Sequence, residues 1–291
     1  MSTPKLVNPS NLQQIHLKQK CKENMHTYFK NKVIIITGSN QGIGRELALQ
    51  LGSYGAKIVI NGRNKEKLDT VLKELGDLNI EAIALNGDIS DQHFCNKLID
   101  NTVSHFGQLD VLINNAGMSA KASLEEGSLD IFKKVIDINL LGTVYASKFA
   151  IPHLKKSKGS LLFISSLAGI HGLPFFTSYS TSKMALTALS DSLRIELYGQ
   201  NIHIGTAYVG FTETADEKTF YNKNGELEVL KKRENVKATP LPVTADKIIR
   251  QIKNRKKSNY HGTMGKINHI LNRISPGFVE FFLKKSLHKF K

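Results

Sequence analysis

Short runs of apolar, mostly β-branched residues recur along the chain from residue 33, and stretches with helical periodicity separate them. The runs are continuous rather than alternating, which is typical of strands that helices cover on both faces. Strands are predicted over residues 33–36, 57–60, 80–85, 111–113, 161–164 and 202–208. Helices are predicted over residues 43–54, 65–75, 91–106, 128–156 and 178–198. This alternation predicts an α/β fold, a doubly wound parallel sheet in a single domain.

Segments outside this alternation divide the chain. Residues 1–31 are predicted to form a basic N-terminal extension with a helix beginning near Ser10, and residues 32–260 the α/β domain. Within that domain, residues 211–242 are polar, irregular and too long for an ordinary connection, so a loop or lid over a substrate is predicted there. Residues 261–291 are predicted to form a basic, amphipathic C-terminal extension.

The positive charge of the chain lies at its two ends. The 291 residues include 40 Lys and Arg against 25 Asp and Glu, a net charge of +15. Residues 1–32 contribute +5 and residues 247–291 contribute +11, which leaves −1 for residues 33–246. A basic chain suggests nucleic acid or an anionic membrane as a partner. The neutral body argues against nucleic acid, because a nucleic-acid-binding core would carry the basic residues itself.

The two cysteines, Cys21 and Cys95, cannot build a disulfide framework, and no cysteine and histidine spacing typical of a metal site is present. No metal is therefore expected. No apolar stretch reaches the roughly 20 residues that span a bilayer, and the first residues contain no apolar signal core. We expect a reduced, cytoplasmic protein, and a peripheral position at a membrane surface stays open because of the basic tail.

A glycine-rich turn follows the first predicted strand and opens the first predicted helix. It reads Thr37-Gly38-Ser39-Asn40-Gln41-Gly42-Ile43-Gly44. Glycines permit a sharp turn and let backbone N–H groups approach a pyrophosphate, to which the helix N-terminus adds partial positive charge. A tight turn without a ligand is the alternative. The flanking strand and helix supply the context that the motif requires, so residues 38–44 are predicted to bind a dinucleotide.

The end of the second predicted strand indicates which dinucleotide binds. Sites for NAD usually carry an acidic residue there, which accepts a hydrogen bond from the ribose 2′-OH. This chain has Gly62 at that position and Arg63 beside it. An arginine can pair with a 2′-phosphate, so NADP(H) is predicted, with Arg63 and Asn64 as ligands. A solvated surface arginine is the alternative.

The third predicted strand ends before Asp88 and Ile89, which are both predicted to contact the cofactor. The carboxylate of Asp88 can accept a hydrogen bond from the adenine amino group. A cap for the helix that begins near residue 91 is the alternative role.

Tyr179 and Lys183 lie four residues apart at the start of the last long predicted helix, so they share a face. A phenol with a pKa of about 10 is a poor acid or base at neutral pH. A nearby ammonium favours the phenolate and lowers the phenol pKa, which makes the pair a candidate for acid–base catalysis. A tyrosine that simply packs on its neighbour is the alternative.

Ser166 strengthens the catalytic interpretation of this pair. It follows the predicted strand over 161–164 at the carboxyl edge of the sheet, where doubly wound folds bind their ligands. Its hydroxyl can stabilise the negative charge that grows on a carbonyl oxygen as a hydride arrives. Ser165 is the competing assignment, and alternation along an extended chain places its hydroxyl on the opposite side.

Two asparagine segments complete the candidates. Asn114-Asn115-Ala116-Gly117 follows the fourth predicted strand, and an ordinary turn is its alternative. Asn139 lies in an apolar helical run, where an amide destabilises the fold unless it is hydrogen-bonded. A catalytic role and a structural bond to water or backbone both stay open for Asn139.

These segments together resemble the short-chain dehydrogenase/reductase family over roughly residues 32–252. The resemblance implies a Rossmann-type fold and an NADP(H)-dependent oxidoreductase that interconverts a carbonyl and an alcohol on a small molecule. It implies that Tyr179 is the acid/base and that Lys183 binds the nicotinamide ribose and lowers the tyrosine pKa. It also implies that Ser166 orients the carbonyl, that Asn139 holds a water in a proton relay, and that residues 115–117 contact the cofactor.

The resemblance carries one departure and one further expectation. Family members often have Pro-Gly after the last long strand, and this chain has Val209 before Gly210. Thr214, four residues after Gly210, keeps the place of the threonine that flanks the nicotinamide in the family, and Gly210 and Thr212 are also predicted to contact the cofactor. Members usually pair through two long helices, here 128–156 and 178–198, so a homodimer or homotetramer is expected.

A catalytically silent nucleotide-binding sensor or scaffold of the same fold is the alternative function. The complete set of Asn139, Ser166, Tyr179 and Lys183 favours a working enzyme over it.

The C-terminal extension lies outside the resemblance and carries two apolar stripes separated by Pro276-Gly277. The first comprises Ile267, Ile270, Leu271 and Ile274, and the second Val279, Phe282, Leu283, Leu287 and Phe290. Two basic amphipathic helices would suit a membrane interface. The alternative is that both pack on the body, as a wall of the substrate pocket or a subunit contact, with lysines facing water.

This tail is also similar in pattern to the extension of lipid-acting members such as 3-ketosphinganine reductases. That similarity favours a hydrophobic or lipid-like carbonyl substrate, with a steroid-like or xenobiotic carbonyl as the alternative.

Overall fold

The computed structural model of the chain describes residues 23–213, 219–229 and 238–290. A seven-stranded sheet with the order β3-β2-β1-β4-β5-β6-β9 lies at its centre, and all its neighbouring strands are parallel. The strands are β1 (Val33–Ile36), β2 (Lys57–Gly62), β3 (Ala82–Asn86), β4 (Val111–Asn114), β5 (Ser160–Ser166), β6 (His203–Val209) and β9 (Ser258–Tyr260). The predicted Rossmann-type, doubly wound sheet is confirmed. Strand β9 was not predicted, because its three residues are mostly polar.

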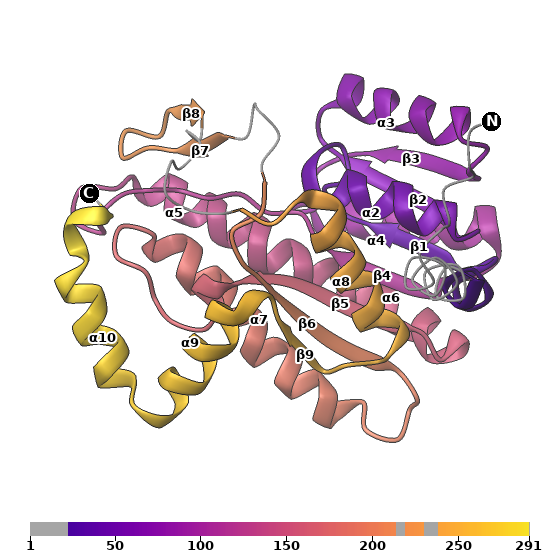
Figure 1. Cartoon of the computed structure of the whole chain (residues 1–291). Helices are drawn as coiled ribbons and strands as arrows, with labels where there is room; N and C mark the ends of the chain where they lie inside the picture. The colour runs from indigo at the N-terminus through magenta and orange to yellow at the C-terminus, as the bar shows by residue number, and fades with distance from the viewer. Residues whose placement is uncertain (1–22, 214–218, 230–237, 291) are drawn as a thin grey trace, which may run out of the picture.

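Helices cover both faces of the sheet (Figure 1). The helices of the body are α2 (Gly42–Ser53), α3 (Lys65–Asp77), α4 (Gln92–Phe106), α5 (Leu129–Ile136), α6 (Gly142–Ser157), α7 (Thr177–Glu196) and α8 (Leu241–Lys253). Apolar residues of α2, α3 and α8 share one core cluster with Ile34 and Ile36. Apolar residues of α4, α6 and α7 share the other with Val33 and Ile35. Alternate residues of β1 therefore enter opposite cores, which explains its unbroken apolar sequence.

The predicted helix over 128–156 contains a π-helical turn, η1 (Asp137–Leu141), between α5 and α6. A π-turn adds one residue to a helical turn and is frequent at functional sites. Asn139 lies in the middle of this turn and is fully buried. Helical periodicity alone did not predict the interruption.

Part of the predicted N-terminal extension belongs to the core. Residues 23–29 are helical, and Met25 and Phe29 are fully buried against the cluster that contains α2 and α8. The helix predicted to begin near Ser10 lies outside the described residues.

The predicted loop over 211–242 contains an antiparallel hairpin of β7 (Thr219–Tyr221) and β8 (Leu227–Val229). Tyr221 fastens the hairpin to the body. Its N–H donates to the Ser119 carbonyl (3.0 Å), and its carbonyl accepts from the Lys121 N–H (2.8 Å). Its hydroxyl accepts from Lys134 Nζ on α5 (2.9 Å). The hairpin is therefore docked on the segment that follows β4.

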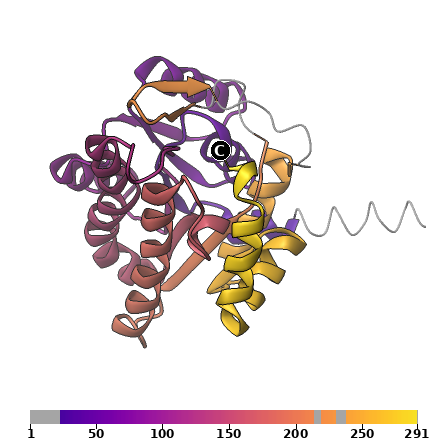
Figure 2. The same ribbon diagram turned by 90° about the vertical axis from the view of Figure 1, so that its left-hand side faces the viewer.

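The C-terminal extension forms α9 (Gly262–Ile274), α10 (Pro276–Lys285) and a 3-10 turn, η3 (Leu287–Lys289). The predicted break lies between the two helices, where Ser275 ends α9 and caps α10. In Figure 1 the two helices form a V beside the body, and Figure 2 shows both at one edge of the molecule. Within the residues described, no helix combines the length and apolarity needed to cross a bilayer.

Candidate active site

The glycine turn after β1 needs glycine at two points. Gly38 and Gly42 have φ angles of +63° and +58°, which residues with a side chain rarely adopt. A Cβ atom added to Gly38 would lie 2.7 Å from the Ala116 Cα. The turn therefore packs directly on the backbone of the loop that follows β4.

Hydrogen bonds join these two loops. Thr37 Oγ1 accepts from the N–H groups of Asn115 and Ala116 (both 3.0 Å). Asn115 Nδ2 in turn donates to the carbonyls of Thr37 and Gly38 (both 2.9 Å). The chain itself thus holds the turn in shape. Sequence reasoning missed Thr37, although a hydroxyl directly before the first glycine was visible.

Ser39 lies beneath the turn and not on its ligand side. Its side chain is fully buried, its N–H donates to the Asn61 carbonyl (2.8 Å), and its Oγ donates to the Ile36 carbonyl (2.7 Å). Both donors of Ser39 therefore serve the protein interior, and its predicted contact with a cofactor stays a prediction.

A cavity of about 460 Å³ opens at the carboxyl edge of the sheet. The predicted residues that line it are Gly38, Asn40, Gln41, Gly42, Ile43, Arg63, Asn64, Asp88, Ile89, Asn115, Ala116, Gly117, Ser166, Tyr179, Lys183, Gly210 and Thr212. Gly44 and Asn139 do not line it, and Thr214 lies outside the described residues.

The cavity suits a dinucleotide. A Cβ atom added to Gly42 would meet nothing within 4 Å, so the backbone at the start of α2 borders open space. Backbone N–H groups at a helix N-terminus, next to open space, bind phosphates well.

Other lining residues were not predicted. They come from strand ends, from the loop after β4, from α8 and from the hairpin, and include Asn61, Gly62, Met118, Ser119, Glu213, Tyr221, Leu227 and Leu241. Asn61, Gly62, Met118 and Glu213 adjoin predicted site residues in the sequence, whereas Tyr221, Leu227 and Leu241 lie in segments without a motif. The tertiary arrangement alone brings them to the cavity.

Gly62 at the end of β2 has a steric reason to lack a side chain. A Cβ atom there would lie 3.0 Å from the Asn40 Cγ of the glycine turn. NAD sites usually carry a carboxylate at this position, and here a side chain with a carboxylate would fit only if Asn40 moved. Beside it, Arg63 Nη1 lies 3.5 Å from Asp88 Oδ2, and both side chains are partly exposed.

Asp88 is held at the cavity by Ser90, whose N–H and hydroxyl both donate to Asp88 Oδ1 (2.9 and 2.8 Å). Burial alone would raise the pKa of the Asp88 carboxyl, but these hydrogen bonds and the Arg63 guanidinium together lower it. Asp88 is therefore a carboxylate at neutral pH. The capping role proposed as its alternative belongs to Asp91, which accepts from the His93 N–H (2.8 Å) at the start of α4.

Tyr179 lies in the first turn of α7 and Ser166 at the end of β5, and both side chains line the cavity. Burial raises the pKa of the Tyr179 phenol, and the hydrogen bond from Ser166 only partly opposes this. The expected lowering of this pKa by Lys183 is therefore not found. Desolvation of the phenolate outweighs the interactions that favour it.

Lys183 is buried one helical turn after Tyr179. Its Nζ donates to the Ile164 carbonyl (2.9 Å) and lies 5.8 Å from the centre of the Tyr179 ring. The carbonyl of Ile164, near the end of strand β5, thus holds the ammonium beside the tyrosine.

The two serines at the end of β5 have different roles. Ser165 Oγ donates to the Lys183 carbonyl (3.0 Å) and is buried. Ser166 is half-buried at the cavity wall, and its Oγ accepts from the Ala168 N–H (3.2 Å). The structure therefore favours Ser166 over Ser165 as the hydroxyl available to a ligand.

Asn139 supports the wall of the cavity from behind. Its Oδ1 accepts from the Met118 N–H (2.8 Å), and its Nδ2 donates to the Met118 carbonyl and to Ser182 Oγ (both 2.9 Å). These contacts satisfy the buried amide and fix the loop after β4 to α7. Of the two roles left open, the structure favours a bond to backbone.

Among residues 23–213, 219–229 and 238–290, no cluster of three potential metal ligands occurs. The chemistry that these residues can support is proton transfer at Tyr179 and hydrogen bonding at Ser166, next to a cavity for a dinucleotide.

The family model described as short chain dehydrogenase matches residues 32–225. Similar proteins include 11-beta-hydroxysteroid dehydrogenase 1A of Arabidopsis thaliana, 36% identical over 220 residues, which is 74% of this chain and 62% of that protein. The 11-beta-hydroxysteroid dehydrogenase A of Sesamum indicum is 33% identical over 215 residues, 73% of this chain and 61% of that protein. The match thus spans about three fifths of the length of these relatives.

A similar solved structure is a crystal structure of a short chain dehydrogenase/reductase from Burkholderia phymatum in complex with NAD. It superposes with a TM-score of 0.71 and 22% identity, and the match covers 79% of this chain and 89% of that one. This similarity supports the fold.

Proposed function

The chain belongs to the short chain dehydrogenase family, and we propose that it is an NADP(H)-dependent oxidoreductase that interconverts a carbonyl and an alcohol on hydrophobic, lipid-like substrates. The observation that carries this proposal is that Tyr179, Ser166 and Lys183 line one cavity, with Lys183 Nζ 5.8 Å from the centre of the Tyr179 ring.

Tyr179 is the proton donor for reduction in this proposal. Its raised pKa keeps the phenol protonated at neutral pH, and the phenol lies at the cavity wall. Bound NADP(H) supplies or accepts the hydride. Ser166 donates a hydrogen bond to the carbonyl oxygen that gains negative charge, and Lys183 stabilises the phenolate left after proton donation. Asn139 acts through Met118, by fixing the loop opposite the tyrosine.

Two features support NADP(H). The backbone of Gly38 to Ile43 would hold the phosphates at the start of α2, and Arg63 would pair with the 2′-phosphate. A carboxylate at position 62 would repel that phosphate, and Asn40 crowds this position. The similar structure from Burkholderia phymatum holds NAD, so the preference rests on Arg63 and Gly62 of this chain.

Apolar side chains around the cavity support a hydrophobic substrate. Met118, Val209, Leu227 and Leu241 line it together with Tyr221 of the hairpin. The relatives are named as hydroxysteroid dehydrogenases, which keeps a steroid-like carbonyl beside a long-chain ketone in the proposal. The hairpin of β7 and β8, docked through Tyr221, would form the lid over this substrate.

The proposal includes pairing of two copies through α5, α6 and α7, where Leu129 and Ile195 are exposed. Light scattering after size exclusion would report a dimer or tetramer.

A spectrophotometric NADPH-oxidation screen against long-chain 3-keto compounds, steroids and small aldehydes tests the activity. Tyr179→Phe should lower kcat about 10²- to 10⁴-fold on any substrate found, because the phenolic proton is lost. NADPH affinity, measured by fluorescence titration, should stay near that of the wild type. Tyr198→Phe, a change at an exposed tyrosine in the turn after α7, is the matched control and should leave kcat unchanged.

Turnover that survives Tyr179→Phe would contradict the mechanism. A wild type that binds NADPH but reduces none of the three substrate classes would instead support a nucleotide-binding sensor.

A further inference from the structure

Helix α9 turns its polar side toward the body. Asn272 Oδ1 accepts from His171 Nδ1 (2.8 Å), Asn272 Nδ2 donates to the Ile170 carbonyl (2.8 Å), and the His269 ring stacks on the Tyr260 ring with 3.9 Å between their centres. Gly265 packs against Leu167. These contacts fix the orientation of α9, and they use few of its apolar residues.

The apolar side of α9 therefore faces outward. Its exposed side chains are Met264, Ile267, Ile270 and Ile274, and Ile274 is 78% exposed. Their spacing of three to four residues places them along one side of the helix. Of the first predicted stripe, Leu271 is half-buried and Ile267, Ile270 and Ile274 are exposed, while the hydrogen bonds of Asn272 hold the opposite side of α9 on the body.

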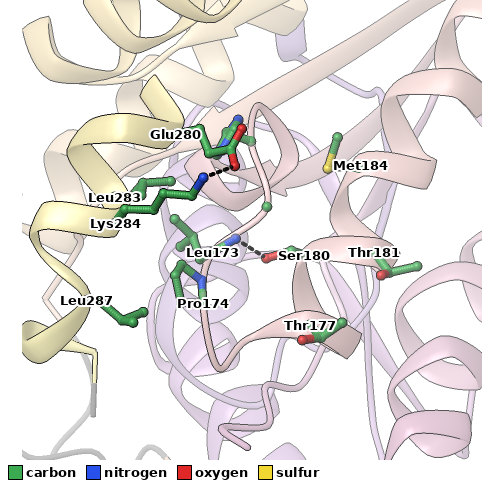
Figure 3. Close-up of a pocket in the computed structure, with 12 residues that line it drawn as sticks. Leu173, Pro174, Thr177, Ser180, Thr181, Met184, Glu280, Leu283, Lys284 and Leu287 are labelled. Atoms are coloured by element: carbon green, nitrogen blue, oxygen red, sulfur yellow. Dashed lines mark hydrogen bonds and ion pairs between the residues drawn. The ribbon is translucent and has the colours of Figure 1, made fainter. Parts of the chain in front are cut away.

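Helix α10 is apolar on two sides. Leu283 lies with Leu287 against a cavity of about 350 Å³, whose far wall includes Leu173, Pro174 and Met184 (Figure 3). Of the second apolar stripe, Leu283 and Leu287 thus face the body, as the alternative to membrane binding expected. Phe278, Phe281 and Phe282 lie on the exposed side, with Phe281 60% exposed. We name the exposed residues of α9 and α10 the outer apolar face: Met264, Ile267, Ile270, Ile274, Phe278, Phe281 and Phe282.

Basic side chains accompany the outer apolar face. The exposed basic residues of α9 and α10 are Lys266, Arg273, Lys284 and Lys285. Glu280 is the acidic residue of these helices, and Lys284 neutralises it in an ion pair (2.8 Å). The surface thus combines exposed phenylalanines with an excess of positive charge.

We infer that α9 and α10 dock the protein on an anionic lipid surface. The outer apolar face would enter the boundary between acyl chains and headgroups, and the basic side chains would contact the lipid phosphates and other anionic groups. A second copy of this chain on the same face would bring like charges together without neutralising them. An anionic bilayer satisfies both the apolar and the basic residues. This inference does not depend on the proposed chemistry.

Vesicle flotation with the full chain tests the docking. The wild type should float with vesicles of phosphatidylcholine and phosphatidylserine, and less with phosphatidylcholine alone or at high salt, because screening weakens the charge contribution. Replacing two tail lysines, Lys266→Glu with Lys285→Glu, should weaken partitioning at least about 20-fold, since each lysine contributes about fivefold near such a surface. Lys97→Glu with Lys148→Glu, two exposed lysines of α4 and α6, is the matched control and should partition at least tenfold better than that tail variant.

A second variant tests the apolar residues. Ile274→Ser with Phe281→Ser should abolish flotation, because serine has almost no apolar surface to bury among the acyl chains. Leu78→Ser with Val243→Ser, at exposed apolar positions of the body, should float like the wild type. Because Ile274 and Phe281 are exposed, circular dichroism and the unfolding midpoint of this variant should match the wild type.

The alternatives give different results. Failure of the wild type to float would overturn the inference, as would equal flotation of the tail variants. Loss of oligomerisation in Ile274→Ser with Phe281→Ser, without vesicle binding by the wild type, would assign the outer apolar face to a second copy. Tyr179→Phe should float like the wild type, so failure of the proposed chemistry and failure of the docking are separable.

Discussion

The glycine turn after β1 and the C-terminal helices differ in whether their side chains are fully satisfied by contacts within the chain. At the turn, the polar groups of the buried Thr37 and Ser39 and of the half-buried Asn115 are hydrogen-bonded within the chain. At α9, Asn272 is also bonded to the body, but four apolar side chains, Met264, Ile267, Ile270 and Ile274, are exposed.

This difference separates two kinds of binding surface. The turn is rigid before any ligand arrives, so a cofactor need not order it, which lowers the entropic cost of binding. No described residue covers the outer apolar face. An exposed apolar area of this kind marks an interaction surface. Changes at the turn should therefore alter folding and cofactor binding, and changes at the tail should alter neither.

The largest effect is expected at Gly38. Gly38→Ala forces an alanine into φ +63° and places its Cβ 2.7 Å from the Ala116 backbone. We expect a loss of about 3 kcal/mol in the free energy of unfolding, from backbone strain and displacement of the loop after β4. Urea denaturation measures it, and NADPH affinity should fall in parallel.

Gly76→Ala is the matched control for that change. Gly76 lies near the end of α3, and an added Cβ would meet nothing within 4 Å. This variant should be more stable than the wild type by about 0.5–1 kcal/mol, because alanine loses less backbone entropy in a helix. Equal destabilisation by both alanines would refute the special packing of the turn.

A smaller effect is expected at Arg63, which follows β2 and lines the cavity. Arg63→Glu removes the guanidinium proposed to pair with the 2′-phosphate and places a carboxylate there. We expect kcat/KM for NADPH to fall about 10- to 100-fold, the range for loss of a charged hydrogen bond, with a much smaller change for NADH. Arg273→Glu on α9 changes charge equally and should leave the NADPH to NADH ratio unaltered. An unchanged ratio in Arg63→Glu would show that Arg63 is a solvated surface residue.

The smallest effect on folding is expected at the tail. Ile274→Ser should change the free energy of unfolding by less than about 0.5 kcal/mol, because the isoleucine is already exposed. Leu47→Ser, at a fully buried position of α2, should by contrast cost about 3 kcal/mol or more. A large loss for Ile274→Ser would mean that the outer apolar face packs on the body or on residues outside the described part.

Several parts of the site could be predicted because they depend on local spacing. Tyr179 and Lys183 share a side of α7, and the glycine turn links a strand to a helix, as their spacing indicated. The roles of Ser165 and Ser166 were also predicted to differ, because alternate residues of a strand face opposite ways. The pKa of Tyr179 was not predictable, since it depends on how deeply the folded chain buries the phenol.

The sequence by itself determined the α/β alternation, the position of the glycine turn and the shared face of Tyr179 and Lys183, because each follows from periodicity over a few residues. Only the tertiary structure decided that Ser39 lies beneath the turn, that Tyr221 fastens a hairpin over the cavity and that Asn139 bonds Met118. It also decided the orientation of α9. An amphipathic pattern shows that a helix has an apolar and a polar side, but not which side faces the body. That depends on the contacts available on the body. Here the contacts of Asn272 and His269 turn the polar side of α9 inward.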